Sequence, residues 1–266
     1  MLPLSDPATR ARAEAPRISK PLLRLFLLYC DFFFRRRMHR LLVSGSEHLQ
    51  TSGPIIIYLN HPSWWDPIIC WEIGTRLMPG RNHYAPMDAD AMEHYKFFRK
   101  LGVFPVKKNS IAGARRFLAV TNAILRDPSA CLWITAQGMF TDVRQRPLKI
   151  MSGVSHLHAP SIPLALDYTF FEESKPEVLA RFGPPLPPHS DKTALTAALA
   201  RELEFVTCSA ITRNVDSYLS ILSGRAGVGG IYDCYRELSA HFTGARFTPE
   251  HAAIHGRKAG QTGNTE

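Results

Sequence analysis

Ile55-Ile-Ile-Tyr-Leu59 is followed without a break by Asn60-His-Pro-Ser-Trp-Trp-Asp-Pro67. The first run comes after Gly53-Pro54 and is apolar and mostly β-branched, which is typical of a buried strand. The second run places a histidine directly after that strand and a carboxylate five positions later. Ligands of α/β sheets usually bind in the loops outside the strand ends. This loop is therefore the first place to look for chemistry.

The rest of the chain alternates short apolar runs with longer segments of helical composition. We expect strands at 103–106, 130–134, 161–168 and 178–182, and helices at 68–78, 88–100 and 111–126. Residues 192–222 and 231–242 are interpreted as C-terminal helices. Strands separated by helices predict an α/β fold with a mixed, largely parallel sheet that helices flank. Pro105 fits an edge strand or a strand end, because proline cannot donate to a central ladder.

Composition and patterning also predict how the chain is divided. We expect a loose N-terminus at 1–17, a membrane-interface helix at 18–40, an α/β core at 41–190, C-terminal helices at 191–243 and a loose tail at 244–266.

The composition excludes several classes of protein. The chain has 266 residues, of which 45% are hydrophobic and 21% are charged, so it is neither disordered nor collagen-like. Its five cysteines are an odd number, widely spaced and without a C-x-x-C pair, which favours a reducing compartment and no structural metal site.

The net charge of +9 fits an anionic partner. No nucleic-acid-binding motif accompanies it, and a nucleic-acid-binding role is the less favoured alternative.

The N-terminal region combines apolar bulk with clustered arginines. Residues 21–34 are rich in Leu and Phe but contain Arg24 and Asp31, and Arg35-Arg-Arg37 follows. No window supplies the roughly 20 apolar residues that a membrane crossing needs. The pattern favours a helix that lies in the membrane interface with its guanidinium groups on lipid phosphates. A first core helix with a solvated basic end is the alternative.

His61 and Asp66 are candidates for a catalytic pair. Five residues of straight helix leave two side chains about 140° apart, so they meet only if His61 lies at or before the start of the helix. Pro62 permits this, since it favours an extended residue before it. An Asp on one imidazole nitrogen fixes the tautomer and leaves the other nitrogen to take a proton. A purely structural pair is the alternative, and no G-x-S-x-G elbow supports Ser63 as a nucleophile.

Four segments in order resemble the motifs of the glycerolipid acyltransferase family, of the 1-acylglycerol-3-phosphate or lysophospholipid acyltransferase type. They are Asn60-His61-x-x-x-x-Asp66, Gly102-Val-Phe-Pro-Val-Lys-Lys108, Thr135-Ala-Gln-Gly-Met-Phe-Thr141 and Ala159-Pro-Ser-Ile-Pro163. The likeness covers residues 40–185. The third motif departs from the usual F-P-E-G-T-R-S: Gln137 stands in place of Glu, and Phe140 in place of an arginine that the family directs at the acceptor's phosphate. The chain resembles a subgroup with a Q-G third motif, whose acceptors need not be glycerophosphates.

The resemblance implies transfer of a fatty acyl group from acyl-CoA or acyl carrier protein to a hydroxyl of a lysophospholipid or related lipid. It implies His61 as general base, Asp66 as its orienting carboxylate, and an oxyanion donor near Gly138. Other residues are expected to bind substrate: Lys107, Lys108, Gln137, Gly138, Arg144, Arg146 and Lys149. A further three are expected to line an acyl groove: Trp64, Trp65 and Phe140. No cofactor or metal is expected, and the protein is placed at the cytoplasmic face of a membrane. A catalytically inactive lipid-binding protein of the same fold is the alternative.

Overall fold

The structure, a computed structural model, describes residues 15–225, and an eight-stranded sheet organises them. The strands are β1 (Arg40–Ser44), β2 (Ile55–Leu59), β3 (Asn82–Asp88), β4 (Val103–Val106), β5 (Ala130–Thr135), β6 (Ser161–Thr169), β7 (Glu177–Phe182) and β8 (Leu219–Ser223). The α-helices are α1 (Lys20–Arg37), α2 (Asp66–Leu77), α3 (Ala89–His94), α4 (Ile111–Ile124) and α5 (Lys192–Thr212). Short 3₁₀ helices are η2 (Ser46–Leu49), η3 (Lys96–Leu101) and η4 (Ser152–His156).

The strands lie in the order β4-β3-β5-β2-β6-β7-β1-β8. Every neighbouring pair from β4 to β6 is parallel, and so is β7 with β1. The β6–β7 and β1–β8 pairs are antiparallel. The predicted α/β fold with a mixed, largely parallel sheet and flanking helices is confirmed. Strand β4, which contains Pro105, is at the edge, as its proline predicts.

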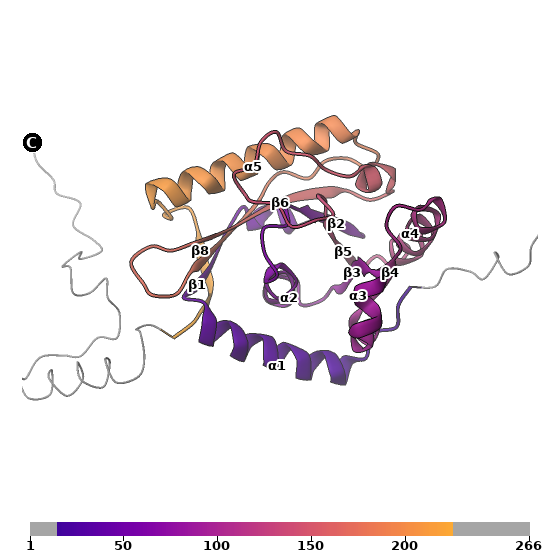
Figure 1. The fold of residues 1–266 in the computed structure, drawn as a ribbon, viewed down its shortest axis with the longest axis horizontal. Coiled ribbons are helices and arrows are strands. Elements are labelled where there is room, and N and C mark those ends of the chain that lie inside the picture. The colour runs from indigo at the N-terminus through magenta and orange to yellow at the C-terminus, as the bar shows by residue number, and fades with distance from the viewer. Residues whose placement is uncertain (1–14, 226–266) are drawn as a thin grey trace, which may run out of the picture.

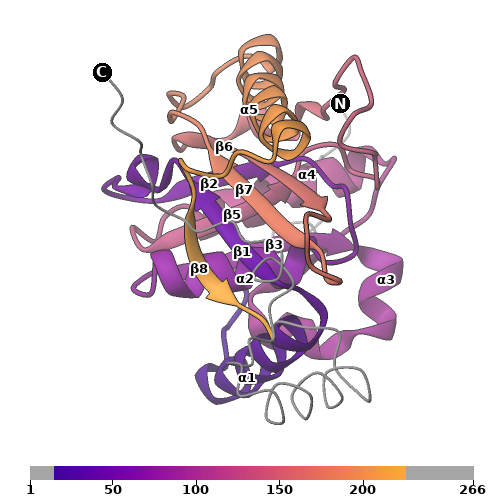
Figure 2. The ribbon, with the colours of Figure 1, turned by 90° about the vertical axis from the view of Figure 1, so that its left-hand side faces the viewer.

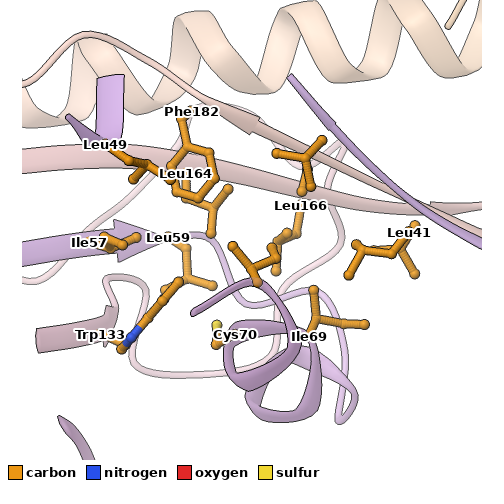
Figure 3. Packing of buried hydrophobic residues seen from close by; sticks show 14 of the residues in the cluster. Leu41, Leu49, Ile57, Leu59, Ile69, Cys70, Trp133, Leu164, Leu166 and Phe182 are labelled. Carbon is orange, nitrogen blue, oxygen red and sulfur yellow. The ribbon is translucent and has the colours of Figure 1, made fainter. Parts of the chain in front are cut away.

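Strand β2 lies near the middle of the sheet and is buried on both faces. Ile57 and Leu59 point to one side and pack with Ile69 of α2 (Figure 3). Ile56 and Tyr58 point to the other side and belong to the cluster that includes Leu195 of α5. The Tyr58 hydroxyl donates a hydrogen bond to the Leu195 carbonyl at 3.0 Å. Because both faces are covered, the whole strand is apolar, as is typical of parallel sheets.

Helices α1 and α2 lie on one side of the sheet and α5 on the other (Figure 1). Helix α1 covers α2 and is part of the core, since Cys30 and Phe34 are fully buried. An edge-to-face contact joins Phe26 of α1 to Trp71 of α2, with ring centroids 4.8 Å apart. The amphipathic segment at the N-terminus is therefore a packed layer of the fold. No helix within residues 15–225 has the length and hydropathy that crossing a bilayer requires.

Two stretches differ from the sequence prediction. Residues 192–222 are not helical throughout: α5 ends at Thr212, Arg213 adopts a left-handed conformation (φ 54°), and β8 runs antiparallel to β1 along the sheet edge (Figure 2). The segment 88–100 is divided into α3 and η3 at Tyr95. Strands β1 and β3 were also not predicted. The expected helix at 231–242 and the two loose ends, apart from residues 15–17, lie outside the described residues.

Replacing Ile57 by Ala is expected to lower the free energy of unfolding by about 2–5 kcal/mol, because it leaves a cavity in the fully packed centre of the sheet. Ile211→Ala is the matched control, since Ile211 on α5 is 77% exposed, and it should change stability by about 0.5 kcal/mol or less. Urea unfolding followed by circular dichroism measures both. Similar losses in the two variants would contradict the central position of β2.

Candidate active site

The loop between β2 and α2 brings His61 to the edge of the sheet where β2 ends. Asn60, the first residue of this loop, is buried and uses its side-chain amide twice: its Nδ2 donates to the Leu166 carbonyl and its Oδ1 accepts from the Leu166 N–H, both at 2.8 Å. This pair of bonds continues the β2–β6 pairing by one step. It fixes the point at which the chain leaves the sheet, and so the position of the next residue, His61.

His61 and Asp66 form a direct contact, with 2.6 Å between His61 Nδ1 and Asp66 Oδ2. The His61 side chain is 17% exposed, whereas that of Asp66 is 1% exposed. Asp66 is the first residue of α2 and His61 lies before it, so the two side chains are not separated by the helical rotation. The contact required by the sequence argument is present.

Asp66 is buried and accepts further hydrogen bonds. The Ser63 N–H donates to Oδ2 at 3.2 Å, and the Tyr168 hydroxyl donates to Oδ1 at 2.7 Å. Burial raises the pKa of the Tyr168 hydroxyl well above its usual value, so Tyr168 stays protonated and remains a donor. Buried carboxylates need such partners, since an unpaired one is strongly destabilised.

Tyr168 was not predicted as a site residue. It belongs to the predicted strand at 161–168, but nothing in the sequence indicates which strand lies beside β2. The β2–β6 pairing provides that information.

Gln137 holds the backbone of His61. Its Oε1 accepts a hydrogen bond from the His61 N–H at 2.9 Å, and the Thr141 N–H donates to the His61 carbonyl at 2.9 Å. The third motif thus fixes both backbone groups of the histidine. An amide oxygen accepts this bond as a carboxylate would, so the change from Glu to Gln keeps the contact.

Gly138 forms a tight turn next to Gln137. Its φ is 70°, and a Cβ at this position would overlap the Met151 sulfur, so only glycine fits without strain. Its N–H donates to the Thr135 carbonyl at 3.1 Å. This N–H is engaged within the turn, and an oxyanion donor near Gly138 stays a prediction. Lys108 lies against the same turn and donates from Nζ to the Gly138 carbonyl at 2.9 Å.

Phe140 and the two tryptophans of the predicted acyl groove lie in different places. The Phe140 ring lies over the His61 imidazole, with centroids 4.3 Å apart and an interplanar angle of 35°. Trp64 and Trp65 instead contact Phe33 of α1, at centroid distances of 6.4 Å and 4.8 Å. Phe140 therefore borders the histidine directly, while the tryptophans connect the loop between β2 and α2 to α1.

The basic residues predicted to bind substrate differ in their surroundings. Arg144 makes two hydrogen bonds to Asp142, which hold the pKa of that carboxyl at about 2. Arg146 is paired with Glu204 at 2.6 Å. Lys107 and Lys149 are exposed. Within residues 15–225, no group of three His, Cys, Asp or Glu side chains is placed to hold a metal ion.

The arrangement can accept a proton at one defined atom. With Asp66 accepting at Nδ1, the proton of a neutral imidazole lies on Nδ1, and Nε2 carries the free lone pair. Because the His61 side chain is partly exposed, solvent or a substrate can reach the ring, whereas the Asp66 side chain is buried. A hydroxyl group that reaches Nε2 can lose its proton to it.

Comparisons with known proteins bear on this site. Residues 40–167 match the family model described as Acyltransferase, which includes His61, Asp66 and the third motif. Among solved structures, the chain is similar to the 1-acyl-sn-glycerophosphate (LPA) acyltransferase PlsC from Thermotoga maritima. Their sequence identity is 14%, the match covers 77% of this chain and 84% of that chain, and the TM-score is 0.47. No curated protein matches the chain. The family match confirms the acyltransferase family inferred from the motifs, and the protein is therefore an acyltransferase that carries its family domain at residues 40–167.

Proposed function

We propose that this acyltransferase moves a fatty acyl group from acyl-CoA or acyl carrier protein to a hydroxyl of a lysophospholipid or related lipid. His61 is the general base and Asp66 orients its imidazole. The observation that carries the proposal is the 2.6 Å contact between His61 Nδ1 and the sealed carboxylate of Asp66, inside a domain of the acyltransferase family.

The reaction needs one proton acceptor and no covalent intermediate on the protein. The acceptor oxygen attacks the thioester carbonyl carbon while its proton passes to His61 Nε2. The C–S bond then breaks, an ester forms, and the imidazolium returns the proton to the leaving thiolate. Asp66 stabilises the positive imidazolium during this step, and a positioned general base typically contributes about 10²–10⁴-fold in rate.

The outer face of α1 supports attachment to a membrane surface. Leu25, Leu28, Tyr29 and Phe32 are 54–70% exposed and follow the i, i+3, i+4, i+7 spacing of one helix face. Arg24, Arg36 and Arg37 flank this stripe and are exposed. Apolar side chains beside guanidinium groups match the acyl boundary and the phosphates of an anionic membrane. Because acyl thioesters are cytosolic metabolites, we place the protein at the cytoplasmic face.

Ring contacts connect this face to the catalytic loop. Tyr29 stacks on Phe33 at 5.6 Å, and Phe33 contacts Trp64 at 6.4 Å between ring centroids. Trp64 is three residues after His61 in the sequence. These contacts support the proposal that lipid held at α1 lies near the loop that carries His61.

Replacing His61 by Ala should lower kcat at least a hundredfold, because the proton acceptor is removed. The assay measures acylated product from acyl-CoA with a panel of lipid alcohols. His158→Ala is the control and should keep wild-type turnover. His158 is exposed and lies just before the amino end of β6, whereas His61 lies just after the carboxyl end of the parallel strand β2. Equal turnover by wild type and His61→Ala would remove His61 as the base. If none of the lipid alcohols in the panel is acylated, the result would favour an inactive lipid-binding protein.

Tyr168→Phe is expected to lower kcat by roughly tenfold while KM changes little. A hydrogen bond to a charged group contributes about 1.5–3 kcal/mol, and here it fixes the orientation of Asp66. Tyr58→Phe is a matched control, since it removes a hydroxyl that bonds to the α5 backbone and lies away from His61. Steady-state kinetics and thermal unfolding of both variants separate the two effects. If both variants lost stability alike and both kept full kcat, the Tyr168 bond would have only a structural role.

The double variant Leu28→Glu with Phe32→Glu should bind vesicles of phosphatidylcholine and phosphatidylglycerol at least tenfold more weakly than wild type. Each side chain contributes about 1.5–3 kcal/mol when fully buried in an apolar phase, and Glu contributes unfavourably. Ile211→Glu on α5 is the control, because Ile211 is as exposed but lies on the other side of the sheet. Co-sedimentation measures binding. Undiminished binding of the double variant would exclude the α1 face as the attachment site.

A further inference from the structure

The surface next to His61 is apolar. The Phe140 ring covers one face of the imidazole at 4.3 Å. Met139 and Met151, which adjoin the Gly138 turn, are exposed, as is Phe140 itself at 61%. A phosphate monoester carries about −1.5 to −2 charges near neutral pH. Placing it against such side chains is unfavourable unless cations accompany it.

Three of the five basic residues predicted to bind substrate already have acidic partners. Lys108 is 3.5 Å from Asp88, Arg144 is bonded to Asp142 by two contacts, and Arg146 is 2.6 Å from Glu204. Each pair joins one positive side chain to one carboxylate, so the three pairs together carry no net charge. To bind a phosphate, each of these three cations would have to leave its carboxylate, and the exposed carboxylate would then repel the ligand.

We propose that the acceptor is a lipid alcohol whose hydroxyl adjoins an uncharged group rather than a phosphate monoester, and that Phe140 determines this preference. The inference rests on the function proposed above and specifies its substrate class. The ring offers a surface to the apolar or sugar-like carbon skeleton next to the reacting hydroxyl. Lys107 and Lys149, which are exposed, are assigned to the phosphates of the acyl donor.

Two acceptors that differ only in the phosphate test the preference. Purified full-length protein is supplied with oleoyl-CoA and either 1-oleoylglycerol or 1-oleoylglycerol 3-phosphate in the same mixed micelles, and the product lipid is measured by mass spectrometry. We expect kcat/KM to be at least tenfold higher for 1-oleoylglycerol. Phe140→Arg should move the ratio at least tenfold toward the phosphate acceptor. Phe140→Leu, which keeps an apolar side chain without charge, should leave the ratio within about threefold of wild type.

The outcomes separate this inference from the proposed function. A wild-type preference for 1-oleoylglycerol 3-phosphate would overturn the inference and leave acyl transfer intact. Equal shifts of the ratio in Phe140→Arg and Phe140→Leu would overturn the role of Phe140. Transfer to neither acceptor, together with no release of CoA in the presence of other lipid alcohols, would contradict the proposed function itself.

Discussion

The contact between His61 Nδ1 and Asp66 Oδ2 exists because the chain changes from strand to helix between these two residues. A continuous helix would turn the side chains about 140° apart. The loop instead leaves β2 at Asn60, whose amide is bonded to β6, and Asp66 becomes the first residue of α2. The helix packs under the sheet through Ile69, and its starting point is thereby fixed. The geometry of the His61–Asp66 pair is a consequence of this packing.

Burial of Asp66 is compatible with stability because donors from separate parts of the chain meet it. His61 and Ser63 come from its own loop, and Tyr168 comes from β6, about a hundred residues later. Gln137 and Thr141 fix the histidine backbone from a further loop. Together these contacts hold the His61 backbone and the carboxylate that meets its imidazole. A site supported in this way is preorganised, which is the condition that the proposed role of His61 as general base requires.

Helix α1 connects the core to the outside. Its inner side chains, such as Cys30 and Phe34, are fully buried, and its outer stripe is apolar and exposed. An ion-pair network in which Arg76 of α2 contacts both Asp31 of α1 and Glu72 of α2 joins the two helices. The same helix therefore stabilises the element that carries Asp66 and presents the surface proposed to meet lipid. Of the two alternatives that the sequence left open for residues 21–34, the structure shows the core helix on the inner face, and the interface helix stays the proposal for the exposed outer face.

Local patterns in the sequence were sufficient for the fold class, for the strand β2 and for His61 with Asp66, because each depends on residues close together in the chain. They limited Pro105 to an edge strand or a strand end, and the sheet order places it in an edge strand. Strand β8 was missed because Leu219–Ser223 becomes a strand through pairing with β1, far away in sequence. Tyr168 and the pairing of Arg146 with Glu204 could not be predicted for a similar reason. Which strand neighbours β2, and which carboxylate an arginine meets across 58 residues, are decided when distant segments pack together. The sequence alone determined that a histidine and a carboxylate follow a buried strand, and only the tertiary structure decided what holds and surrounds them.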